Sequence, residues 1–213
     1  MTKRPERPYQ RVPSLQTARY ALRGKIARWF EEPASALLDK LGFTPNLTTL
    51  TGTAVSVGAG AAAADGRFVL AGILVIFGST FDMLDGGIAR RTGQVSRRGA
   101  LLDSVMDRVS EGALLLGLLI FYTRGATFDQ MLAILAFIAF SGSMMVSYVR
   151  ARAEGLGMKG TAGFATRPER VVVVAVTLLI SQPDWGLWIL AVATPLSALH
   201  RFWAEWHSTG DSD

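Results

Sequence analysis

Charge-free apolar segments constrain the fold of this 213-residue chain more than any other feature. Two of them, 41–64 and 130–149, are long enough to span the hydrocarbon core of a bilayer. Four shorter segments reach that length when their polar ends are included: 68–81, 112–123, 171–183 and 185–200. A soluble all-α domain is the alternative, but half of the residues are hydrophobic, which leaves too little polar surface to cover so many buried helices.

We therefore predict an all-α integral membrane protein with six transmembrane helices, at about 43–64, 67–86, 99–122, 130–153, 167–182 and 185–206. Residues 1–42 are expected to form a cytoplasmic segment without a signal peptide, residues 43–206 the membrane domain, and residues 207–213 a polar tail. The N-terminal segment is expected to contain a juxtamembrane amphipathic helix with an apolar face of Leu22, Ile26, Trp29, Phe30, Leu37 and Leu38. This helix either lies on the inner leaflet or packs against the protein.

The positions of the basic residues predict the orientation. Nineteen of the 22 Lys and Arg residues lie in the N-terminal segment, the 87–98 connection, the 150–170 region or the C-terminal end. The others are Arg67, Arg124 and Arg108, of which the last lies within a predicted helix. Both termini are therefore assigned to the cytoplasm of a multi-pass cell-membrane protein. The net charge of +5 fits an anionic membrane surface, and no nucleic-acid-binding motif is present.

Four aspartates within DMLDGGIARRTGQVSRRGALLDSVMD, residues 82–107, are the second constraining feature. Asp82 and Asp85 are one helical turn apart, as are Asp103 and Asp107, so each pair shares a helix face. Four carboxylates brought together would repel one another unless a divalent cation neutralised them. The pattern predicts a metal site, and ion pairs with Arg90, Arg97, Arg98 and Arg108 are the structural alternative.

The predicted topology places both aspartate pairs at one depth. The helix over 67–86 runs inward and ends with the first pair, and the helix over 99–122 starts on the same side with the second. Polar and basic residues at the ends of the other helices reach the same layer: Ser147, Arg150, Arg152, Arg167, Arg170 and Arg201. Charges near the bilayer are costly, so this layer is the candidate functional site.

The spacing D-x2-D-G-x2-A-R-x8-G-x3-D-x3-D is similar to the signature of the CDP-alcohol phosphotransferases. The resemblance covers nearly the whole chain, including Thr44-Pro45-Asn46 at the first predicted span. It implies a membrane enzyme, expected to form a homodimer, that transfers a phosphatidyl or related group from a CDP-alcohol to a second alcohol and releases CMP. SYVRARAE at 147–154 and RPER at 167–170 resemble the phosphatidylinositol phosphate synthases of actinobacteria, which implies CDP-diacylglycerol and inositol 1-phosphate as substrates.

The resemblance also implies residue roles. Metal ligands for Mg²⁺ or Mn²⁺, expected as two ions, are Asp82, Asp85, Asp103 and Asp107, and Asp107 is also the general base. The CDP-lipid site is expected to comprise Asn46, Asp82, Asp85, Gly86, Ala89, Arg90 and Gly99. Tight helix packing is the alternative for the small residues, and capping of the first helix is the favoured role of Asn46.

The basic cluster predicts a phosphorylated acceptor, because guanidinium groups hold phosphate oxygens bidentately. By resemblance, the acceptor-phosphate site comprises Ser147, Arg150, Arg167, Arg170 and Arg201. Lys is usual in that subgroup where this chain has Arg150, but the positive charge is kept. The orientation signal alone is the alternative, and it accounts best for Arg152 and Lys159. Glu169 is expected either to orient Arg170 or to pair with it.

Three other functions are compatible with the sequence. Glycerol 3-phosphate as acceptor would give phosphatidylglycerophosphate, and a soluble CDP-inositol donor would give an inositol phosphodiester. A divalent-cation transporter would place polar groups near the midplane and along both halves of a path. In this chain the polar groups gather at one predicted face, which favours an enzyme.

Overall fold

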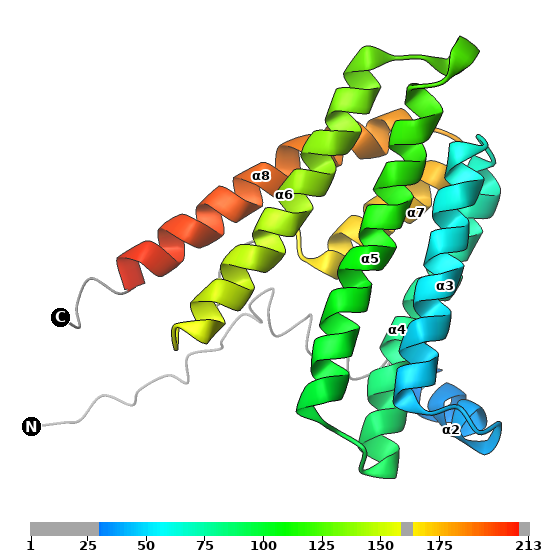
Figure 1. Ribbon diagram of the computed structural model, residues 1–213, viewed down its shortest axis with the longest axis vertical. Helices are drawn as coiled ribbons and strands as arrows, with labels where there is room; N and C mark the ends of the chain where they lie inside the picture. Colours follow the sequence, from blue (N-terminus) through cyan, green and yellow to red (C-terminus); the bar gives the residue numbers. More distant parts are fainter. Residues whose placement is uncertain (1–29, 159–163, 209–213) are drawn as a thin grey trace, which may run out of the picture.

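The computed structural model describes residues 30–158 and 164–208, and this part of the chain is entirely helical (Figure 1). Its α-helices are α2 (Glu32–Lys40), α3 (Pro45–Ala64), α4 (Phe68–Thr92), α5 (Arg97–Tyr122), α6 (Gln130–Gly155), α7 (Arg167–Leu179) and α8 (Pro183–Ser208). A 3₁₀ turn, η2 (Gly125–Thr127), connects α5 to α6. The all-α prediction is confirmed, and α3 to α8 correspond to the six predicted helices.

Helix α4 extends beyond its predicted end at residue 86 and continues to Thr92. It ends at Gly93, whose φ of +68° is a left-handed conformation that favours glycine and terminates helices. Because the Gly86–Gly87 pair does not interrupt the helix, Asp82 and Asp85 lie within α4 rather than at its end. Their side chains can therefore face the neighbouring helices.

Three helices in the described residues are long and apolar enough to cross a membrane: α3, α4 and α6. Helix α5 has more charge in its first half, because Arg98, Asp103, Asp107 and Arg108 all lie there. These three helices indicate a membrane protein. The crossing of the membrane by α5, α7 and α8 stays a prediction.

Helix α2 packs against the C-terminal half of α4 (Figure 1). The Ser35 hydroxyl donates to the Leu84 carbonyl at 3.4 Å, and Arg91 Nε lies 3.4 Å from Asp39 Oδ2. Gly87 permits the approach, since a Cβ there would overlap Ser35. Leu22, Ile26 and Trp29 of the predicted amphipathic helix lie outside the described residues, and its described part packs against α4.

Helix α3 packs against both α4 and α5, and small residues allow the backbones to approach closely. A Cβ on Gly60 would overlap the Ala113 carbonyl of α5, and a Cβ on Gly117 would overlap the Gly60 carbonyl. Many of the buried residues of α3 are small: Gly52, Ala59, Gly60, Ala62 and Ala63. The abundance of small residues in α3 therefore serves helix packing.

The remaining helices complete the bundle: α6 packs on α5 and α8, and α7 packs on α4 and α8. The connections α4–α5 and α5–α6 lie at opposite ends of the molecule (Figure 1). Beside the α5–α6 connection, the Tyr122 hydroxyl donates to Asp184 of α8. Helix α7 starts at Arg167, and this start brings the Arg167 side chain beside Asp82 of α4 and Asp107 of α5.

Candidate active site

Asp85 is held in the interface between α3 and α4. It is 7% exposed, and its Oδ2 accepts a hydrogen bond of 2.5 Å from the Thr49 hydroxyl of α3. Asp82, one turn earlier, also faces α3, where Gly52 leaves room for it: a Cβ on Gly52 would lie 2.7 Å from Asp82 Oδ1. Helix α3 thus orients the first aspartate pair through a threonine and a glycine.

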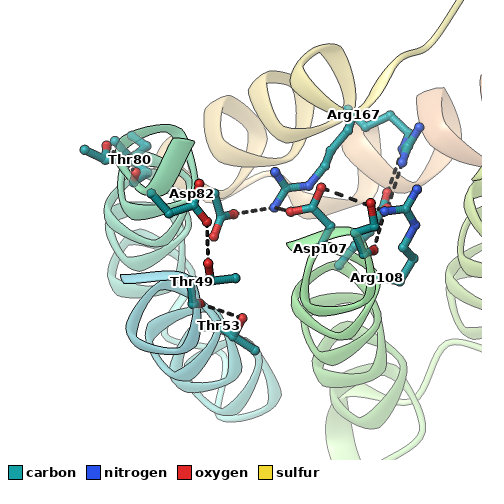
Figure 2. A network of polar contacts seen from close by, with 12 residues as sticks. Thr49, Thr53, Thr80, Asp82, Asp107, Arg108 and Arg167 are labelled. Carbon is teal, nitrogen blue, oxygen red and sulfur yellow. Dashed lines mark hydrogen bonds and ion pairs between the residues drawn. The ribbon is translucent and has the colours of Figure 1, made fainter. Parts of the chain in front are cut away.

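A single guanidinium nitrogen connects the two aspartate pairs (Figure 2). Nη2 of Arg167, at the start of α7, forms ion pairs with Asp82 Oδ2 of α4 and with Asp107 Oδ1 of α5, the latter at 2.9 Å. Arg108 is a more distant partner, with Nη1 at 3.9 Å from Asp107 Oδ2, and it donates to the Ser104 carbonyl of its own helix. The carboxylates of Asp82 and Asp107 therefore lie close enough to share one cationic group.

The aspartates supply a donor set that fits a divalent cation. In residues 30–158 and 164–208, no three Asp, Glu, His or Cys side chains converge in a geometry ready to hold one ion. Asp82 and Asp107 nevertheless present carboxylate oxygens to a shared positive charge, and hard divalent cations prefer these oxygens. The residue types and their approach across two helices fit the predicted metal, and a metal role for each aspartate stays a prediction.

A cavity of about 620 Å³ lies among α3, α4 and α5, and we call it the first cavity. Six of the seven residues predicted to bind the CDP-lipid line it: Asn46, Asp85, Gly86, Ala89, Arg90 and Gly99. Thr49 and Asp103 line it too, whereas the seventh predicted residue, Asp82, is not part of the described lining. The structure thus brings together residues that are separated by more than one helix in the sequence.

Gly86 and Gly99 lie beside side chains that line the first cavity rather than against the backbone of a neighbouring helix. A Cβ on Gly86 would lie 3.1 Å from Arg90 Nη1, and one on Gly99 would lie 3.2 Å from Ser96 Oγ. Both neighbours are cavity-lining polar side chains, not the backbone of another helix. This distinguishes them from Gly60 and Gly117, which pack helix against helix.

One favoured role and one alternative proposed for residues of the first cavity are corrected. The N-cap of α3 is Thr44, whose hydroxyl accepts from the Leu47 amide at 3.3 Å, so the favoured capping role of Asn46 is wrong. Arg90 pairs with Glu31, just before α2, rather than with an aspartate. The reason in both cases is position: Asn46 lies after Pro45 inside the helix, and Arg90 faces α2.

A second cavity, of about 990 Å³, lies between α5, α6 and the start of α7. Four of the five predicted acceptor-phosphate residues line it: Ser147, Arg150, Arg167 and Arg170. The fifth, Arg201 of α8, is buried and is not part of its described lining. Asp107 also lines this cavity, so the predicted general base and the basic cluster share one space.

Arg170 is held by a residue that the sequence reasoning missed. Glu111 of α5 accepts from Arg170 Nε at 2.6 Å and from Nη2 at 2.8 Å. Glu169, the expected partner, accepts from the Thr166 amide at 2.7 Å and forms the capping box of α7. The available signal was the spacing, since Asp103, Asp107 and Glu111 follow one another at i, i+4.

Asp103 lines both cavities, so the two spaces meet at this aspartate on α5. Small residues and Arg90 lie on one side, and Asp107 with several arginines lies on the other. This arrangement can hold two ligands whose reacting ends meet beside the carboxylates. A two-substrate transfer reaction requires such an arrangement.

Comparisons with known proteins agree with this geometry. Residues 43–199 match the family model of the CDP-alcohol phosphatidyltransferases. The phosphatidylinositol phosphate synthase of Mycobacterium tuberculosis (strain ATCC 25618 / H37Rv) is 37% identical over 194 residues, covering 85% of this chain and 88% of the relative. The archaetidylinositol phosphate synthase of Pyrococcus horikoshii is 33% identical over 181 residues, covering 84% of this chain and 92% of the relative.

Solved structures show the same similarity. A crystal structure of M. tuberculosis phosphatidylinositol phosphate synthase (PgsA1) with CDP-DAG bound matches with a TM-score of 0.79 at 34% identity, covering 86% of this chain and 97% of that chain. The same enzyme in complex with manganese and citrate matches with a TM-score of 0.80, covering 86% and 92%.

Proposed function

Because this chain belongs to the CDP-alcohol phosphatidyltransferase family, we propose that it transfers the phosphatidyl group of CDP-diacylglycerol to inositol 1-phosphate and releases CMP. The observation that carries the proposal is the pair of cavities that meet at Asp103. The first contains the small residues of the family signature, and the second contains Asp107 and the arginines. A nucleotide donor and a phosphorylated acceptor match these two linings.

The first cavity holds the CDP headgroup. Gly86, Ala89 and Gly99 leave space for the nucleotide, and Arg90 provides positive charge for a phosphate. Asn46 offers amide donors and acceptors to the base or the ribose. The diacylglycerol tails stay in the bilayer, so the donor enters laterally between helices.

The four aspartates, which lie on α4 and α5, would hold Mg²⁺ or Mn²⁺ as two ions. At these carboxylates a divalent metal would supply positive charge to neutralise the diphosphate and the departing CMP. Binding requires the Arg167 side chain to release Asp82 or Asp107, since it pairs with both. Thr49 keeps Asp85 oriented toward the first cavity throughout.

Asp107 removes the proton from the acceptor hydroxyl. The hydroxyl oxygen then forms a bond to the phosphorus that carries diacylglycerol, and the bond from that phosphorus to the oxygen of CMP breaks. Asp107 is suited to this role because it lines the second cavity beside Asp103, where the two spaces meet. Its carboxylate lies on the acceptor side of α5.

The second cavity binds the acceptor through its phosphate. Ser147, Arg150 and Arg170 line one continuous space with Arg167, and guanidinium groups recognise phosphate oxygens. A phosphorylated acceptor supplies phosphate oxygens for these guanidinium groups to bind, whereas free inositol and serine carry no phosphate. Arg201 belongs to the proposed acceptor site as a buried residue behind this lining.

The membrane arrangement follows from the same assignment. We place α3 to α8 across the cell membrane as six spans, with both termini and both cavities on the cytoplasmic side, and residues 1–42 at the inner leaflet. The Lys and Arg distribution supports this orientation. The enzyme is expected to be a homodimer.

The test is CMP release by the purified protein with CDP-diacylglycerol and Mg²⁺ or Mn²⁺. Parallel reactions contain inositol 1-phosphate, glycerol 3-phosphate, free inositol, serine or no acceptor. Release only with inositol 1-phosphate is expected. Release with glycerol 3-phosphate in its place would overturn the acceptor and keep the mechanism, whereas no release from folded, metal-binding protein would overturn the donor and favour transport.

A further inference from the structure

Glu111 continues the acidic row of α5 but differs from the aspartates in its contacts. It lies one turn after Asp107, and both of its carboxylate oxygens accept from Arg170 of α7, at 2.6 Å and 2.8 Å. Arg170 is 4% exposed, so this pair is largely removed from solvent. Both carboxylate oxygens of Glu111 are therefore engaged by Arg170.

The pair forms part of the wall of the second cavity. Glu111 and Arg170 both line it, and on their other side they line a small cavity of about 40 Å³. Ser110, whose hydroxyl has no hydrogen-bond partner in the described residues, lines that small cavity too. The guanidinium therefore lies between two spaces, only one of which can admit a substrate.

The guanidinium of Arg170 is held on more than one edge. It has five N–H donors. Glu111 accepts two of them, and the Ala165 carbonyl accepts a third from Nη1 at 2.8 Å. Ala165 adopts a φ of +51°, a left-handed conformation that is uncommon for a residue with a Cβ. The connection before α7 thus presents this carbonyl to Arg170, and two N–H donors remain.

We propose that Glu111 is a positioning residue for the acceptor: it fixes the plane of the Arg170 guanidinium so that the remaining donors face the phosphate in the second cavity. This proposal rests on the proposed function, in which the acceptor carries a phosphate. A guanidinium can bind a carboxylate on one edge while it offers other donors to a phosphate. Because the orientation exists before the substrate binds, less side-chain freedom is lost on binding. Glu111 therefore acts on acceptor affinity rather than on the chemical step.

The first variant is Glu111→Gln, which keeps the size of the side chain but removes its charge and one acceptor oxygen. The KM for inositol 1-phosphate is expected to rise about tenfold, as for loss of one charge-assisted hydrogen bond. The kcat at saturating acceptor and the KM for CDP-diacylglycerol should stay within about twofold, because this contact lies on the acceptor side of α5. Glu111→Asp, which keeps the charge, should give an intermediate KM for the acceptor.

A double variant tests whether Glu111 acts through Arg170. Arg170→Ala alone should raise the KM for inositol 1-phosphate, and adding Glu111→Gln to it should cause no further rise. Additive increases would overturn the proposal. Asp39→Asn is the matched control: Asp39 of α2 is paired with Arg91 of α4, and neither residue lines the two cavities, so the kinetic constants of this variant should not change.

The remaining outcomes separate this proposal from the proposed function. An unchanged acceptor KM in Glu111→Gln would overturn the positioning role. A fall in kcat together with a lower thermal unfolding temperature would also overturn it, because that result would show a structural role for Glu111. If Glu111→Gln does not fold, Glu111→Asp provides the same comparison of KM with kcat. Failure of the unmodified enzyme to release CMP with inositol 1-phosphate would instead overturn the proposed function.

Discussion

Asp107 differs from the other three aspartates of the signature in its surroundings. It lines the second cavity but not the described wall of the first, and it contacts Arg167 at 2.9 Å. We expect Asp107→Asn to lower kcat by roughly 10²-fold or more, the contribution of a general base, while CDP-diacylglycerol binding is largely retained. Steady-state CMP release and equilibrium binding of the donor would check this. Activity close to that of the unmodified enzyme would remove Asp107 from the role of base.

Thr49 orients Asp85 through a hydrogen bond from its hydroxyl. Thr49→Val keeps the shape but removes the hydroxyl that donates to this buried carboxylate at 2.5 Å. A hydrogen bond to a charged group contributes about 1.5–3 kcal/mol, so kcat/KM for CDP-diacylglycerol is expected to fall roughly tenfold or more. Thr51→Val is the control, since the Thr51 hydroxyl donates to the Leu47 carbonyl of its own helix. Equal effects of the two variants would contradict the assignment.

At the scale of elements, the contact between α3 and α5 depends on close backbone approach. A Cβ on Gly60 would overlap the Ala113 carbonyl, and backbone cannot move aside as a side chain can. We expect Gly60→Ala to destabilise the protein by about 1–3 kcal/mol, the cost of overpacking, and thermal unfolding in detergent would measure it. Gly58→Ala is the control: the nearest atom to its Cβ would be Leu74 Cδ1 at 4.0 Å. There the added Cβ should be neutral or stabilising, because glycine is unfavourable within a helix.

At the scale of the whole molecule, the absence of Cys from the sequence makes the topology directly measurable. Val95 lies in the connection between α4 and α5, and Ala126 lies in η2 at the opposite end of the bundle. Each can be replaced singly by cysteine. A membrane-impermeant thiol reagent applied to intact cells should label Ala126→Cys and leave Val95→Cys unlabelled until the membrane is opened. The reverse pattern would invert the proposed orientation.

The sequence alone predicted the helices and the face of the aspartates well, because these depend on local features. Charge-free runs, caps and i, i+4 spacing act within one helix, so α3 to α8 and both acidic pairs were found. The predicted end of α4 was six residues early, since the helix continues past Gly86 and Gly87 and ends at Gly93, which has a left-handed φ. Asn46 was misassigned because a cap is defined by backbone geometry, which Thr44 provides.

The tertiary structure alone decided which side chains meet across helices. Thr49 with Asp85, Glu111 with Arg170, and Arg167 with Asp82 and Asp107 are contacts between residues far apart in the chain. Spacing indicates which of these groups share a helix face, but it does not identify their partners, since each contact depends on how two helices rotate and approach. Local sequence thus determined which chemical groups the protein carries and on which helix faces, whereas packing of the helices determined the partners of those groups and divided the site into two cavities.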